Sequence, residues 1–186
     1  MTVSAETLTT LEKHIRKVME IKKSFTFYEG QDYCVSEKNA KKIAELAGLK
    51  FIGIGAYRMV LLFDNLIIKI PLFFDSLLMN RTEYDFWNLE LKDSPIANCF
   101  VPALHTFMDC CVYPLIKVFK NFEEVKQMSI KIEEVIAKVQ SYMHHISKKF
   151  QSFIYDIYID YNREQDMTWK NLGIYNGQVV ILDYAL

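Results

Sequence analysis

Apolar residues recur at helical spacing near the start of the chain. They would form one face of a helix over residues 5–23, and the positions concerned are Leu8, Leu11, Ile15 and Val18. Ser36 can cap a second helix over residues 37–47, which Gly48 would close. We expect this helical segment to pack against the domain that follows, and a surface that binds a partner protein is the alternative.

Short apolar runs follow, and their β-branched and aromatic residues are typical of strands. The runs occupy residues 49–52, 59–63, 66–71, 104–108 and 112–118. Asp109 would lie at the turn between the last two. The pattern predicts a five-stranded sheet.

The helical period returns after residue 128. Apolar residues from Ile132 to Phe150 follow the i, i+3, i+4, i+7 rule and predict one long helix, which Ser129 would cap. Residues 172–175 and 178–182 flank Asn176-Gly177, a strong two-residue turn signal, so they predict a hairpin. Separate sheet and helix segments of this kind indicate the α+β class.

Composition narrows the class of protein. The chain has 186 residues, 51% of them hydrophobic, and a net charge of −1. It can therefore bury a core, and it has no basic excess that would attract nucleic acid or an anionic membrane. No apolar run approaches the roughly 20 residues that span a bilayer, and the first residues are not a signal peptide. We expect a cytoplasmic protein, in the host cytoplasm if it is viral. No structural zinc site is expected, because the cysteines lack metal-binding spacing; they are Cys34, Cys99, Cys110 and Cys111.

Two segments of the predicted sheet carry candidate chemistry. Gly53 and Gly55 lie between two strands, where glycine lets the backbone approach a phosphate, although they could simply relieve a tight hairpin. Lys69 interrupts an apolar strand, and a buried cation needs a partner unless it reaches water from a sheet edge. Glu83, in a helical segment over residues 80–91, could be that partner. Glu90, seven residues later, is the alternative.

A second group of polar residues lies near the C-terminus. Asp166 precedes Asn171 by five residues, and Asp183 follows the predicted hairpin. Such an Asp can orient or deprotonate an attacking hydroxyl, while the Asn and the second Asp can hold Mg²⁺ on nucleotide phosphates. Taken singly, each of these residues is also common in turns.

In their order along the chain, these motifs resemble a minimal protein-kinase-like domain. The chain is similar to small serine/threonine kinases and kinase-like proteins of bacteriophages and bacteria. The resemblance covers residues 49–186, with residues 1–48 as a helical N-terminal extension in one compact unit. It implies an α+β, protein-kinase-like two-lobe fold with a small antiparallel sheet lobe and a truncated helical large lobe.

The resemblance also implies ATP and Mg²⁺ as cofactors and assigns roles to residues. Lys69 and Asp166 would be catalytic, and Asn171 and Asp183 would bind the metal. The nucleotide would contact Gly53, Gly55, Arg58, Val60, Lys69, Glu83, Leu115 and Lys117. The favoured activity is phosphorylation of Ser or Thr on a protein. The alternatives are a catalytically weak or inert module that binds a host or partner protein, and a phosphotransferase acting on a small molecule.

Several positions depart from the family pattern. Arg58 replaces the third glycine of the loop, and it would cover the phosphates less closely or contribute a charge. Glu164-Gln165 replaces the His-Arg before the catalytic Asp, and Asp183-Tyr184-Ala185 replaces Asp-Phe-Gly. Without the Arg of the His-Arg pair there is no evident acceptor for an activation-loop phosphate, so we expect no regulation of that type. No activation segment follows Asp183, which weakens the case for peptide substrates. A short large lobe would also leave an apolar surface that a second copy could cover in a homo-oligomer.

Overall fold

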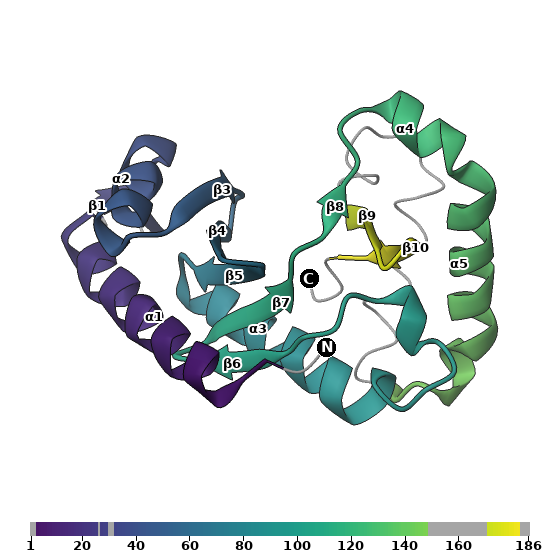
Figure 1. The fold of residues 1–186 in the computed structure, drawn as a ribbon. Coiled ribbons are helices and arrows are strands. Elements are labelled where there is room, and N and C mark those ends of the chain that lie inside the picture. The colour runs from purple at the N-terminus through teal and green to yellow at the C-terminus, as the bar shows by residue number, and fades with distance from the viewer. Residues whose placement is uncertain (1–2, 26, 30–31, 149–170, 183–186) are drawn as a thin grey trace. The chain divides into compact units, whose positions relative to one another are not determined.

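A computed structural model describes residues 3–25, 27–29, 32–148 and 171–182 (Figure 1). The chain divides into two compact units. The first unit comprises Met1–Tyr84 and Ala103–Leu115, and the second comprises Asp85–Pro102 and Ile116–Leu186. The class is mixed α+β: N-terminal helices, a five-stranded antiparallel sheet, further helices and a small three-stranded sheet.

The first unit opens with two helices, α1 (Ala5–Phe25) and α2 (Glu37–Ala47), with a short hairpin of β1 (Phe27–Glu29) and β2 (Asp32–Cys34) between them. Ser36 caps α2 by accepting a hydrogen bond from the Asn39 N–H, and Gly48 ends it with a left-handed φ of 74°. Both sequence predictions for these helices are confirmed. No helix in the described part of the chain is long and apolar enough to cross a membrane.

Five strands of the first unit form one antiparallel sheet. In spatial order they are β3 (Lys50–Ile54), β4 (Arg58–Phe63), β5 (Leu66–Pro71), β7 (Cys110–Pro114) and β6 (His105–Phe107). The prediction of a five-stranded sheet is confirmed, but the expected strand over 112–118 is wrong at its end. Pro114 pairs with Leu66, the first residue of β5, and proline has no N–H with which to continue a ladder.

Alternate residues of these strands point to opposite faces of the sheet. One face, which we call the apolar face, packs against α1 and α2 in a single hydrophobic cluster. The residues that the sheet contributes to this cluster are Met59, Leu61, Leu66, Ile68, Ile70, Cys110 and Val112. The residues that α1 contributes are Leu11, Ile15 and Val18. The helical segment therefore packs against the sheet, as predicted.

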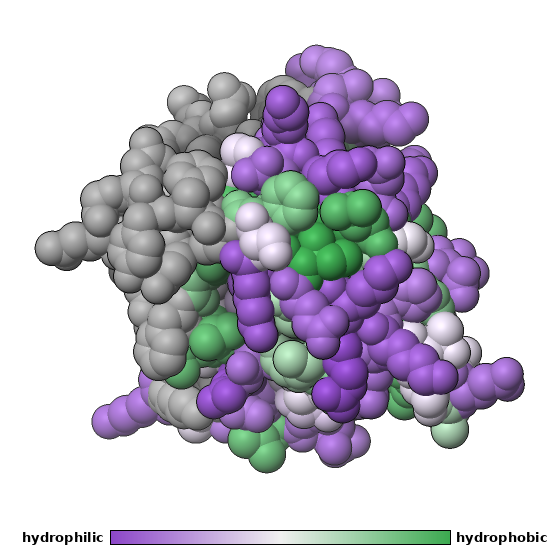
Figure 2. Space-filling model, turned by 90° about the vertical axis from the view of Figure 1, so that its left-hand side faces the viewer, coloured by the Kyte–Doolittle hydropathy of each residue, from purple (hydrophilic) through white to green (hydrophobic). Residues whose placement is uncertain are grey.

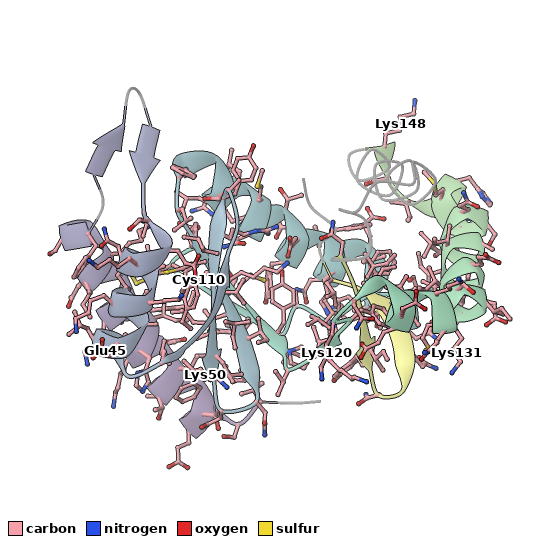
Figure 3. The ribbon with its side chains drawn as sticks, turned by 90° about the horizontal axis from the view of Figure 1, so that it is seen from above. Glu45, Lys50, Cys110, Lys120, Lys131 and Lys148 are labelled. Carbon is pink, nitrogen blue, oxygen red and sulfur yellow. The ribbon has the colours of Figure 1, made fainter. Side chains whose placement is uncertain are left out.

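The surface agrees with this amphipathic arrangement. Figure 2, which looks from the side where Figure 1 places α1 and α2, shows mostly hydrophilic residues around a limited hydrophobic area. Figure 3 shows Glu45 and Lys50 at the outside of the first unit, whereas Cys110 lies among other side chains. Cys110 is completely buried.

Helix α3 (Phe74–Phe86) continues into a π-helical turn, η1 (Trp87–Leu91). The Ser76 hydroxyl fixes its start by accepting from the Phe73 N–H and donating to the Phe73 carbonyl. Ser76, Asn80 and Glu83 are completely buried. Since they are spaced at i, i+4 and i+7, the buried stripe of this helix is polar.

The second unit contains η2 (Ala97–Cys99), α4 (Phe122–Gln127), α5 (Ser129–Tyr142) and η3 (Met143–His145). The predicted start of the long helix near Ser129 is confirmed, but its predicted cap and its predicted end are wrong. Asn121 caps a separate helix, α4, and α5 follows it with Met128 at its N-cap position and no side-chain cap, so Ser129 does not cap it. The helix ends at Tyr142 because the chain turns extended at Ile146, which is buried. Phe150 lies outside the described residues.

The three-stranded sheet of the second unit has the order β10 (Gln178–Ile181), β9 (Leu172–Tyr175) and β8 (Lys117–Val118). Asn176 and Gly177 connect β9 and β10 with φ values of 49° and 77°, as a type I′ turn requires. The predicted hairpin is therefore confirmed. Beyond it, the Leu182 N–H donates to the Asn171 carbonyl at 2.8 Å.

Candidate functional site

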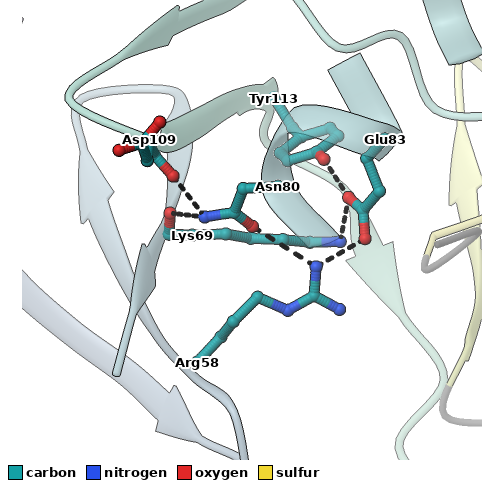
Figure 4. Close-up of polar contacts among 6 residues, drawn as sticks. All are labelled: Arg58, Lys69, Asn80, Glu83, Asp109 and Tyr113. Carbon is teal, nitrogen blue, oxygen red and sulfur yellow. Dashed lines mark hydrogen bonds and ion pairs between the residues drawn. The ribbon is translucent and has the colours of Figure 1, made fainter. Parts of the chain in front are cut away.

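The candidate site is a cluster of charged side chains centred on Glu83 (Figure 4). Its Oε1 lies 2.5 Å from Arg58 Nη1, and its Oε2 lies 2.8 Å from Lys69 Nζ. The Tyr113 hydroxyl donates to Oε2 as well. Glu83 is 0% exposed, so its charge depends on these partners instead of on water.

Lys69 reaches Glu83 from the second face of the sheet, which we call the polar face and define by Arg58, Lys69, Cys111 and Tyr113. In the strand register Lys69 lies opposite Val60 on β4 and Cys111 on β7. Its Nζ lies 4.6 Å from the centre of the Tyr113 ring, within range of a cation–π contact. The alternation of β5 therefore turns Lys69 away from the apolar face, on which Ile68 and Ile70 lie.

Asn80 joins α3 to strands β4 and β5 and to the turn between β6 and β7. Its Nδ2 donates to the Lys69 carbonyl at 3.1 Å and to the Asp109 carbonyl at 2.7 Å. Its Oδ1 accepts from Arg58 Nη1 at 3.4 Å. Arg81, the next residue on the helix, forms an ion pair with the Asp109 carboxylate. These contacts hold α3 against the polar face one turn before Glu83.

The charged cluster also affects its neighbour Cys111. Burial and, to a smaller extent, the nearby Glu83 charge raise the pKa of this thiol to about 12. Burial likewise raises the pKa of Cys110 far above the ordinary range. Both thiols therefore stay protonated at neutral pH, and neither has the character of a reactive cysteine.

The two loop glycines lie where β3 ends. Gly53 is within β3, next to an irregularity in the register with β4, and the Gly55 N–H donates to the Arg58 carbonyl at 2.8 Å. A Cβ built on Gly53 would meet no atom within 4 Å, and one on Gly55 would lie 3.9 Å from its nearest contact. Neither residue has a positive φ. The protein's own packing therefore does not require glycine at either position.

Several predicted nucleotide contacts lie elsewhere than in the cluster. The Leu115 side chain is 46% exposed, and its N–H donates to the Asn65 carbonyl at 2.8 Å. Lys117 is exposed on β8 of the second unit, where it pairs with Ile174. The predicted metal ligand Asn171 also belongs to the second unit. Asp166 and Asp183 lie outside the described residues.

The structure selects Glu83 over Glu90 as the carboxylate beside Lys69. Glu90 belongs to the π-helical turn of the second unit and accepts from the Ser147 N–H at 3.4 Å. Sequence analysis missed Asn80 and Tyr113 altogether. A signal for Asn80 was present, because Ser76, Asn80 and Glu83 form a polar stripe at helical spacing.

No group of three or more His, Cys, Asp or Glu residues in the described ranges is placed to hold a metal ion. A depression of about 300 Å³ in the second unit is lined mainly by exposed polar side chains, and none of its residues belongs to the Glu83 cluster. Its lining residues include Asn98, Lys131, Glu134, Lys138 and Gln178.

Comparison of the sequence with models of known protein families, with curated proteins and with solved structures gave no significant match. Function is therefore inferred from the described residues and from the motifs of the sequence.

Proposed function

We propose that the protein is an ATP- and Mg²⁺-dependent phosphotransferase of the protein-kinase-like type, acting on Ser or Thr of a protein. The observation that carries this proposal is the contact of 2.8 Å between Lys69 and the fully buried Glu83. A strand lysine held by a helix carboxylate is the pair that a kinase needs to hold the phosphates of ATP.

The proposed roles follow from the chemistry of phosphoryl transfer, in which positioning and charge stabilisation dominate. Lys69 would bind the α- and β-phosphates, and Glu83 would keep its ammonium group in place. Asp166 would orient the attacking hydroxyl. Asn171 and Asp183 would hold Mg²⁺, which neutralises charge on the phosphates.

Three further observations support a nucleotide site. The space above Gly53 is open and a Cβ on Gly55 would meet only an ordinary contact, so a phosphate could approach the backbone there without a Cβ between them. The backbone of Leu182, the residue before Asp183, is hydrogen-bonded to Asn171. Val60 lies opposite Lys69 on the polar face, where it offers an apolar contact to a base.

A second candidate is an inert kinase-like module that binds a host or partner protein. The Glu83 cluster favours it in one respect, because three protein groups already engage both carboxylate oxygens. Such a cluster can stabilise a fold without binding any ligand. The two candidates differ in whether phosphate is transferred.

A transfer assay with Mg-ATP labelled on its γ-phosphate separates these candidates. The wild-type protein would be assayed alone, with cell extract and with a set of metabolites, beside Asp166→Asn. Asp64→Asn is the matched control, because Asp64 is an exposed turn residue whose φ of 50° asparagine also adopts readily.

The proposal predicts label on protein Ser or Thr with wild type and Asp64→Asn, and none with Asp166→Asn. Label only on an added metabolite would instead indicate a small-molecule phosphotransferase. No transfer, together with a partner protein that co-purifies equally with Asp166→Asn, would contradict the enzyme and favour the binding module.

A further inference from the structure

We propose that Arg58 is a positioning residue, which holds Glu83 and α3 against the sheet before any nucleotide binds. The contact between Lys69 and Glu83 is then permanently assembled and does not form on activation. The part of this inference that concerns nucleotide rests on the proposed function; the part that concerns α3 does not.

The first argument is the direction in which Arg58 points. Its position in the sequence, after the loop glycines, predicts a side chain that reaches the phosphates. In the structure Arg58 is only 8% exposed and lies against α3 (Figure 4). Its Nη1 contacts Glu83 Oε1 at 2.5 Å and Asn80 Oδ1 at 3.4 Å. Arg58, which replaces the third glycine, thus binds side chains of α3.

The second argument is the division of the Glu83 carboxylate. Arg58 takes Oε1, whereas Lys69 and Tyr113 take Oε2. The two cations therefore do not compete for one oxygen, and each fixes a different end of the carboxylate. Arg58 can hold Glu83 in place while Lys69 adjusts to a phosphate. A carboxylate bound by Lys69 alone would lack this restraint.

The third argument is that Arg58 ties β4 to two points of α3. Asn80 and Glu83 lie on the same buried stripe, one turn apart, and Arg58 Nη1 contacts both. Movement of α3 away from the sheet would leave buried charged and polar groups without these partners, which is costly. In kinases, the position of the corresponding helix controls whether the lysine–glutamate pair forms. Here the pair has its own internal restraint, which Arg58 supplies from β4.

The first test does not depend on nucleotide. Amide hydrogen exchange of the α3 peptide would be compared, without ligand, in wild type, Arg58→Gln and Arg58→Lys. Arg16→Gln is the matched control, because Arg16 is an exposed residue of α1 whose guanidinium lies over the Phe107 ring. The inference predicts at least about tenfold faster exchange in α3 for Arg58→Gln, unchanged exchange in α1 and α2, and partial rescue by Arg58→Lys. Equal exchange of α3 in wild type and Arg58→Gln would overturn it.

The second test asks whether Arg58 acts through Lys69. Binding of Mg-ATP and of adenosine would be measured by calorimetry in wild type, Arg58→Gln, Lys69→Met and the double variant. We expect Arg58→Gln to weaken Mg-ATP about tenfold and leave adenosine unchanged, with no further loss in the Lys69→Met background.

An equal loss of Mg-ATP affinity in both backgrounds would overturn the inference, because Arg58 would then act independently of Lys69. If wild type binds no Mg-ATP, the proposed function fails, and hydrogen exchange still decides whether Arg58 holds α3.

Discussion

The two faces of the five-stranded sheet differ in what their side chains do. The apolar face joins α1 and α2 in one hydrophobic cluster, while the polar face carries charged groups that meet α3. Both faces are built from the same strands, and neighbouring residues alternate between them. Burial of apolar area stabilises the first face, whereas the second face is stable only because each buried charge has partners. Functional side chains on the polar face can therefore be substituted without disturbing the hydrophobic cluster on the apolar face.

The adjacent cysteines show the difference within one strand. Cys110 belongs to the hydrophobic cluster. Cys111 lies opposite Lys69, and the charge of Glu83 raises the pKa of its thiol. Burial raises the pKa of both thiols, and the carboxylate that raises it further is Asp109 at Cys110 and Glu83 at Cys111. A one-residue step along β7 thus changes the electrostatic environment.

The largest effect is expected from Glu83→Gln, which removes the charge that two buried cations share. We predict a loss of about 4 kcal/mol in the free energy of unfolding, because breaking a buried ion pair leaves uncompensated charge. Urea titration measures it. Glu45→Gln is the control, since Glu45 pairs with Lys42 at the surface and should contribute less than about 0.5 kcal/mol. Equal effects of the two substitutions would show that the polar cluster adds nothing to stability.

Ile68→Ala tests the apolar face. The residue is completely buried, and truncation should cost about 3 kcal/mol through lost burial and a cavity. Ile52→Ala, at a 47% exposed position of the same sheet, should cost no more than about 0.5 kcal/mol. Well below its unfolding temperature, Ile68→Ala should bind Mg-ATP as wild type does. A large loss of nucleotide affinity in this variant would mean that the two faces are not independent.

The smallest effect at neutral pH comes from Cys111, whose contribution to the pH dependence of stability begins only near pH 9. Its pKa is about 12 in the folded protein and 9.0 when unperturbed, so the folded state keeps a proton that the unfolded state releases in this range. Stability from this group is complete below pH 9 and is lost as the pH rises toward 12. The free energy of unfolding of wild type should therefore fall relative to Cys111→Ala above pH 9. Lys22, whose pKa burial lowers, is present in both proteins and cancels. If the free energies of unfolding of wild type and Cys111→Ala changed in parallel above pH 9, the raised pKa of the buried Cys111 thiol would be contradicted.

Sequence pattern was sufficient where local physics decides the structure. The cap at Ser36, the turn at Asn176-Gly177 and the strand periodicity all act over a few residues, and the structure agrees with them. The contact between Lys69 and Glu83 could also be anticipated, because a lysine in an apolar strand needs an anion.

The sequence was not sufficient where partners distant in the sequence determine the direction of a side chain or the end of a strand. Arg58 turns inward because Glu83 and Asn80, more than 20 residues away, offer it acceptors. The strand containing Pro114 ends where its neighbour β5 begins, although the missing N–H of proline was a local signal for that end. Asp166 and Asp183, on which the proposed chemistry depends, remain predictions from the sequence.

The most direct test of the central claim is calorimetric titration of Mg-ATP into wild type and Lys69→Met, with and without Mg²⁺. If the polar face of the sheet is a phosphate site, wild type binds in the micromolar range only with Mg²⁺, and Lys69→Met loses most of that affinity. Absence of binding in wild type, or equal binding by both proteins, would contradict a nucleotide site at Lys69.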